Sequence, residues 1–120
     1  MRILVADDSD LVRRAVISLI ATEKDLEVCG EVSNGHDCIR HARELRPDLI
    51  LLDISMPGLN GLETATQLRR EIPPVKILIL SQYDPAVLDA SARSAGADGC
   101  VDKSRLGTDL LSKIRTFSTT

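Results

Sequence analysis

The chain has 120 residues, with 15 Lys and Arg against 18 Asp and Glu, and its hydrophobic share of 43% includes only two aromatic residues, Tyr83 and Phe117. This length corresponds to about one domain, for which we take residues 1–120, with an aliphatic core that needs no disulfide or structural metal. A formal net charge of −3, without a basic patch, argues against nucleic-acid binding by this stretch. No apolar run reaches the ~20 residues of a bilayer span and no signal peptide is recognisable, so we expect a cytoplasmic protein that does not contact a membrane.

Five short segments rich in Ile, Leu and Val predict strands. In the three strongest, polar residues do not alternate with apolar ones, which is typical of strands covered on both faces of a parallel sheet. The strong segments are residues 3–6, 49–52 and 77–80, and the weaker ones are residues 27–32 and 99–101.

Helical patterns follow each of these strands. In chain order, the predicted helices span about 9–22, 35–45, 60–72, 84–96 and 104–117. In the first helix, apolar residues recur at helical spacing from Val12 to Ile20, and we place Arg13 and Arg14 on its other face. Strand followed by helix, five times over, predicts an α/β domain with a parallel sheet and helices on both faces. Only residues 118–120 are expected to form a frayed end.

The three cysteines form no CxxC pair, which excludes a zinc knuckle and a disulfide framework. We expect Cys29, Cys38 and Cys100 to be reduced thiols that act as small apolar side chains, with a redox role as the alternative.

Polar side chains follow four of the five predicted strands. Asp7 and Asp8 come after the first, Asp53 after the third, Ser81 after the fourth and Lys103 after the fifth. In a parallel sheet these strand ends lie at one edge, where open α/β sheets bind their ligands. We therefore expect three carboxylates, one hydroxyl and one ammonium to converge there.

The carboxylates predict a bound divalent cation. Two ionised carboxylates ~4 Å apart repel by roughly 4 kcal/mol at an effective dielectric constant of about 20, so three of them need more positive charge than Lys103 supplies. Oxygen ligands without His or Cys favour Mg²⁺ over Zn²⁺. His36 and His41 fall in the second predicted helix, where we expect solvated side chains.

These residues resemble the receiver domain of two-component response regulators. The resemblance spans essentially the whole chain and rests on Asp7-Asp8, on Asp53 within Leu52-Asp53-Ile54-Ser55-Met56-Pro57-Gly58, on Ser81, and on Lys103 within Gly99-Cys100-Val101-Asp102-Lys103. It implies a flavodoxin-like (βα)5 fold, which is a doubly wound parallel five-stranded sheet in the order 2-1-3-4-5 with helices on both faces.

The resemblance also implies a phosphorylation-activated signalling switch rather than a turnover enzyme. Asp53 would accept a phosphoryl group from a histidine kinase or a phosphotransfer protein. Mg²⁺ would lie between Asp8, Asp53 and the backbone carbonyl of Ser55, and Asp7 would reach it through water.

Two further residues would act on the transferred group. Lys103 would offset charge on the phosphoryl oxygens, and the Ser81 hydroxyl would donate to one of them and pull the next loop inward. This change of shape would alter association with a partner or with a second copy in a homodimer. The segments 83–85 and 97–99 resemble receivers that carry a C-terminal helix-turn-helix domain, so DNA would be a partner only through an output domain absent from these residues.

Two positions depart from the family pattern. Cys100 stands where many receivers carry Phe or Tyr, so the coupling from Ser81 to the surface is predicted to be lost or to run differently. Tyr83 is a partial substitute for this ring or, as the simpler interpretation, lines the mouth of the site. Ser104 follows Lys103 where many receivers have Pro, and because a cis bond before a non-proline costs about 2.5–4 kcal/mol we expect a trans bond. We also expect slow loss of the phosphoryl group, because the Tyr83 ring would shield phosphorus from water.

Other interpretations of the same residues stay open. Asp8 or Ser9 can cap the first helix, and Asp53, Ser81 and Lys103 can be ordinary loop and surface residues. Two alternative functions are a receiver-like interaction module that is not phosphorylated and a haloacid-dehalogenase-like phosphatase. The chain lacks the second acid of the Asp-x-Asp motif of those phosphatases, because Ser55 stands at that place.

Overall fold

The computed structural model describes residues 1–117, so the predicted frayed end lies outside the described residues. Five strands alternate with five α-helices, and a 3₁₀ turn, η1 (Lys103–Arg105), precedes the last helix. The strands are β1 (Arg2–Ala6), β2 (Glu27–Val32), β3 (Leu49–Asp53), β4 (Lys76–Ser81) and β5 (Gly99–Asp102). The helices are α1 (Asp10–Ala21), α2 (Gly35–Leu45), α3 (Gly61–Glu71), α4 (Pro85–Ser94) and α5 (Leu106–Arg115).

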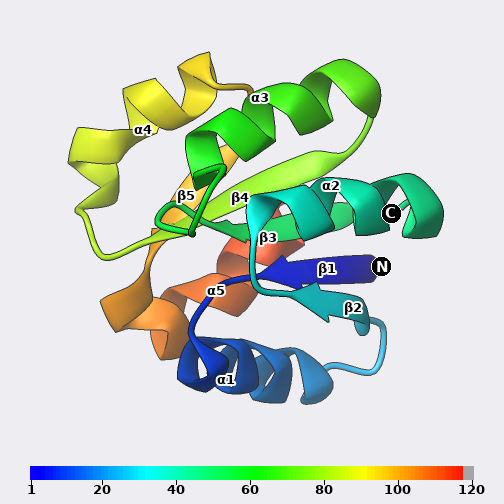
Figure 1. Cartoon of the computed structure of the whole chain (residues 1–120). Helices are drawn as coiled ribbons and strands as arrows, with labels where there is room; N and C mark the ends of the chain where they lie inside the picture. Colours follow the sequence, from blue (N-terminus) through cyan, green and yellow to red (C-terminus); the bar gives the residue numbers. More distant parts are fainter. Residues whose placement is uncertain (118–120) are drawn as a thin grey trace.

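All strands pair in parallel, in the order β2-β1-β3-β4-β5, which confirms the order implied by the resemblance (Figure 1). The register places Asp53 beside Leu80 and Ser81 beside Asp102. The carboxyl ends of β3, β4 and β5 therefore lie at one edge of the sheet, as the pattern of strand ends predicts.

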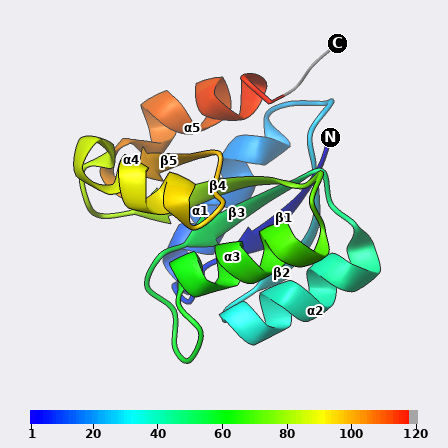
Figure 2. The ribbon, with the colours of Figure 1, turned by 90° about the horizontal axis from the view of Figure 1, so that it is seen from above.

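Helices cover both faces of the sheet, with α2, α3 and α4 on one side and α1 and α5 on the other (Figure 1). Figure 2, seen from above the first group, shows α2, α3 and α4 in front of the strands and α1 behind them. Successive residues of each central strand alternate between two aliphatic cores. In β1, for example, Leu4 packs toward α2 and α3, whereas Ile3 and Val5 pack toward α1 and α5. This arrangement is the reason that these strands read as continuous apolar runs.

Polar side chains cap the helices that begin near the site. The Ser9 side chain accepts a hydrogen bond from the Val12 amide, so Ser9, and not Asp8, caps α1. At the start of α3, Asn60 and Glu63 form a reciprocal capping box. Because Ser9 performs the capping, the Asp8 carboxylate is free for another role.

Arg13 lies with Arg14 outside the apolar stripe of α1, as the helical periodicity predicts. Its side chain is nevertheless only 15% exposed, a feature that the periodicity does not show. Its long stem turns the guanidinium back toward the end of β1, where it meets acceptors. Arg14, in contrast, is exposed as predicted.

Two further expectations concern the backbone. Residues 1–117 contain no cis peptide bond, which confirms the trans bond between Lys103 and Ser104. Among the helices that the structure describes, none is long and apolar enough to cross a membrane.

Candidate functional site

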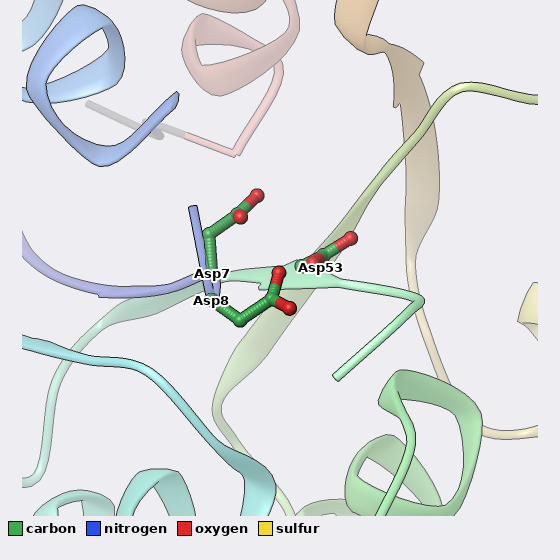
Figure 3. Close-up of side chains that lie close together, drawn as sticks. All are labelled: Asp7, Asp8 and Asp53. Carbon is green, nitrogen blue, oxygen red and sulfur yellow. The ribbon is translucent and has the colours of Figure 1, made fainter. Parts of the chain in front are cut away.

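Three carboxylates meet at the carboxyl edge of the sheet (Figure 3). Asp7 and Asp8 follow β1 and Asp53 is the last residue of β3, and one oxygen of each lies within 4.8 Å of those of the other two. Beside them is a cavity of about 490 Å³. Its lining residues are Asp8, Ser9, Val12, Asp53, Ile54, Ser55, Gln82, Tyr83 and Lys103.

Lys103 bridges the two buried carboxylates. Its Nζ lies 2.8 Å from Asp7 Oδ2 and 2.9 Å from Asp53 Oδ1, and its own side chain is only 13% exposed. Burial by itself lowers the pKa of Lys103, but the hydrogen bonds to Asp53 and Asp7 outweigh this effect, and the pKa is raised. The ammonium therefore stays charged at neutral pH.

Backbone amides hold both buried carboxylates in place. The Ser9 amide donates to Asp7 Oδ1 at 2.8 Å, and the Ser55 amide donates to Asp53 Oδ1 at 3.2 Å. Burial raises the pKa of Asp53 to about 6, with a further increase from the Asp7 charge, although the Lys103 and Ser55 hydrogen bonds oppose it. Asp53 is thus mainly ionised at pH 7, but at a cost to stability.

The residues fit a hard divalent cation. Three carboxylates against one ammonium leave a formal charge of −2, and no Lys, Arg or His of residues 1–117 forms an ion pair with Asp8. Apart from Lys103, no described group donates to the fully buried Asp7 Oδ2. This unneutralised set of oxygen ligands beside a cavity suits Mg²⁺.

Ser81 lies one strand farther along the same edge but does not line the cavity. It is 1% exposed, and its Oγ accepts a hydrogen bond from the Tyr83 amide at 2.9 Å. This bond uses a lone pair and leaves the hydroxyl proton available to another acceptor.

Cys100 fills its place on β5 as a small buried side chain. Its Sγ lies 3.9 Å from the Pro85 carbonyl and 3.9 Å from Asp89 Oδ1, so α4 packs directly over it. Burial raises the pKa of this thiol. Tyr83, a residue that is 63% exposed, lines the cavity.

Four of the six predicted site residues line the cavity, namely Asp8, Asp53, Ser55 and Lys103. Asp7 is buried against Lys103, and Ser81 is buried at the end of β4. Sequence reasoning did not identify Gln82, which lines the cavity, although its position directly after Ser81 was a usable signal. It also did not show the contacts of Arg13, because helical periodicity cannot show that a long side chain folds back on its own helix start.

Comparison with known proteins agrees with this geometry. Residues 3–115 match the family model described as the response regulator receiver domain. The chain belongs to this family. Receiver domains belong to the response regulators of two-component signalling systems and bind Mg²⁺ at an acidic pocket. In this chain, Asp7, Asp8 and Asp53 form an acidic cluster that could hold a metal ion.

Two kinds of relatives illustrate the similarity. The response regulator protein VraR of Staphylococcus aureus is 34% identical over 118 residues, which cover 98% of this chain and 56% of that protein. The receiver domain thus spans little more than half the length of this relative. A crystal structure of a LuxR-family two-component response regulator from Aurantimonas sp. SI85-9A1 superposes with a TM-score of 0.90 at 30% identity, covering 96% of this chain and 82% of that one. The response regulator domain of Thermotoga maritima CheB gives a TM-score of 0.88 at 29% identity, with 97% and 94% covered.

The raised pKa of Asp53 predicts that its charge destabilises the metal-free receiver domain. The folded state binds the Asp53 proton more tightly than the unfolded state, so the free energy of unfolding falls as the pH rises from about 4 to about 6. We expect Asp53→Asn to raise this free energy by about 1–3 kcal/mol at pH 7 in a chelator, and by little at pH 4. Urea denaturation at the two pH values measures the free energy of unfolding of both proteins. If Asp53→Asn and the wild-type chain were equally stable at pH 7, the raised pKa of Asp53 would be contradicted.

Proposed function

We propose that the receiver domain, residues 1–120, is a phosphorylation-activated switch in which Asp53 accepts a phosphoryl group. The donor is a histidine kinase or a phosphotransfer protein, since response regulators interact with histidine kinases. The observation that carries the proposal is the position of the Asp53 carboxylate. It lines a cavity large enough for a phosphoryl group, with the Lys103 ammonium 2.9 Å away. Beside it is the Asp8 carboxylate, which has no ion-pair partner among residues 1–117.

The proposed transfer is an in-line displacement. A carboxylate oxygen of Asp53 forms the new bond to phosphorus while the bond from phosphorus to the donor imidazole nitrogen breaks, and the imidazole keeps that electron pair. Lys103 stays beside the equatorial oxygens and offsets their charge. Asp7, Asp8, Asp53 and the Ser55 carbonyl would hold Mg²⁺, and the bound ion would supply further positive charge near these oxygens.

The switch then follows from Ser81. In its hydrogen bond with the Tyr83 amide the Ser81 oxygen is the acceptor, so the hydroxyl proton remains available for another acceptor. We propose that this hydroxyl donates to a phosphoryl oxygen and draws the loop before α4 inward. The surface formed by α4, β5 and α5 would then change its affinity for a partner or for a second copy of the chain. Because Cys100 is small and lies under α4, this movement proceeds without an aromatic side chain at that position.

The output of the whole protein is also a proposal. The relatives are longer than this chain, and one similar structure is described as a DNA-binding response regulator of the LuxR family from Staphylococcus aureus. We propose that DNA is contacted only by an output domain outside these residues. The receiver domain itself regulates and does not act as a turnover enzyme.

Phosphoryl transfer can be tested without the natural donor. We expect incubation with Mg²⁺ and acetyl phosphate to add the mass of one phosphoryl group to the wild-type chain and none to Asp53→Asn. Asp48→Asn is a matched control, because Asp48 precedes β3 at the opposite edge of the sheet and should leave the uptake intact. A wild-type chain that gains no mass is instead an interaction module that is not phosphorylated. Repeated turnover of a phosphate ester would favour the phosphatase alternative.

The lifetime of the phosphorylated state depends on access of water to the cavity. We predict that the phosphorylated state is long-lived, because Tyr83 lines the same cavity as Asp53. Tyr83→Ala should therefore accelerate the loss of the added mass, and an unchanged rate of loss would refute this role for the ring.

A further inference from the structure

Arg13 makes contacts that its sequence position does not suggest. From the first turns of α1, its Nη1 donates to the backbone carbonyl of Asp7 at 2.7 Å. Its Nε donates to Glu31 Oε1 on β2 at 3.1 Å, and its Nη2 pairs with Asp10 at the start of α1. The guanidinium is therefore held by three acceptors from three segments, and it ends against the turn that carries the site acids.

The bond from Arg13 completes the fixation of Asp7. The Asp7 amide donates to the Val32 carbonyl at 3.1 Å, and its two carboxylate oxygens meet the Ser9 amide and Lys103. The Asp7 carbonyl is its last polar group, and Arg13 is the donor that reaches it. Because the peptide unit is planar, holding this carbonyl fixes the plane of the peptide that leads to Asp8.

The charge of Arg13 does not explain its position near the acids. Asp10 and Glu31 both form ion pairs with it, so the local group carries no positive excess that could attract an anion or repel a cation. The remaining effect of Arg13 on the site is therefore geometric. Asp8, whose carboxylate lacks an ion-pair partner among residues 1–117, extends from the peptide that Arg13 orients.

We propose that Arg13 is a positioning residue for the metal site. By holding the Asp7 carbonyl it fixes the direction in which the Asp8 carboxylate enters the cavity, and Asp10 and Glu31 hold the guanidinium in place for this task. The inference rests on the proposed Mg²⁺ site. According to this inference, Arg13 affects the affinity for Mg²⁺ although it touches neither the metal nor the phosphoryl group.

The test is calorimetric titration of the chain with Mg²⁺, with no phosphoryl donor present and below the unfolding midpoint of every variant. Loss of a residue that orients a metal ligand costs about 10–100-fold in affinity, so Arg13→Ala should raise the Kd for Mg²⁺ at least about tenfold. Arg14→Ala is the matched control on the exposed face of α1 and should leave the Kd unchanged. Glu31→Gln removes an ion pair but keeps the bond to the Asp7 carbonyl, and should change the Kd far less than Arg13→Ala.

The outcomes separate positioning from mere stabilisation. A lower unfolding midpoint for Arg13→Ala with an unchanged Kd would overturn the inference, as would an equal loss of affinity in the control Arg14→Ala. A wild-type chain that binds no Mg²⁺ overturns the proposed metal site as well, whereas wild-type binding that Arg13→Ala leaves intact overturns this inference alone. Should Arg13→Ala fail to fold, Arg13→Met keeps the apolar stem and replaces it in the same titration.

Discussion

Replacing Lys103 with Met should destabilise the receiver domain by about 3–5 kcal/mol at pH 7.5, because it leaves buried carboxylates without their cation. Asp7 and Asp53 are 0% and 1% exposed, and Lys103 lies within 2.9 Å of an oxygen of each. Met has a similar stem, so the lost charge and its hydrogen bonds dominate the change. Urea denaturation in a chelator measures the free energy of unfolding.

The loss of stability in Lys103→Met should be smaller at acidic pH than at neutral pH. The pKa of Asp53 is about 6 while Lys103 opposes its protonation, and without Lys103 it rises further. At pH 5 Asp53 then takes up a proton and the repulsion with Asp7 disappears, so the loss should be smaller than at pH 7.5. Adding Asp53→Asn to Lys103→Met should recover part of the loss at pH 7.5. Lys24→Met, at an exposed lysine, should stay within about 0.5 kcal/mol of wild type. No recovery in the double variant would contradict the assignment.

Replacing Gly61 with Ala should destabilise the receiver domain by about 3 kcal/mol or more, because α3 begins directly against the backbone of β3. A Cβ at Gly61 would lie 2.2 Å from the Asp53 carbonyl oxygen and 2.6 Å from the Ile54 Cα. Both are backbone atoms, so no side-chain rotation relieves the clash. The Gly61 amide also donates to the Ile54 carbonyl at 2.9 Å, so a shift of α3 breaks this bond.

Gly107→Ala is the matched control for this prediction. Gly107 lies in α5, and a Cβ there would meet no heavy atom within 4 Å. Ala in a helix is favoured over Gly, so we expect this variant to be stabilised by about 0.5–1 kcal/mol. The same urea denaturation compares the two variants. If Gly61→Ala were as stable as the wild-type chain, this result would contradict the close approach of α3 to the backbone of β3.

Gly61 and Lys103 illustrate why parts of the site were not predictable. The sequence indicates a helix start near Asn60 and a lysine after the fifth strand, since both signals are local. It does not indicate that α3 touches the Asp53 carbonyl or that one ammonium lies between Asp7 and Asp53. These contacts join residues from different strands, and side-chain reach and backbone spacing set them only after the sheet has formed.

The other site residues also divide into those that local sequence signals predict and those that depend on tertiary contacts. The acids at the strand ends were predictable because a parallel sheet brings all its carboxyl ends to one edge. The burial of Ser81 was not, because it depends on the loop toward Tyr83. The contacts of Arg13 were not predictable either, because periodicity describes the direction of a Cβ and not the end of a long side chain.

The sequence by itself determined the five strands and five helices, the aliphatic character of both cores, and which polar residues follow each strand. These features depend on residue type and on spacing within a few turns, and they need no knowledge of distant segments. The resemblance to known receivers supplied the strand order, which the pairing of the strands confirms. The tertiary structure alone decided which oxygen faces which donor at the site. Lys103 lies between two carboxylates, Arg13 donates to the Asp7 carbonyl, and Asp8 has no ion-pair partner within residues 1–117. The physical reason is that hydrogen bonds and ion pairs act over about 3–4 Å, so they are set by the packing of segments that the sequence holds far apart.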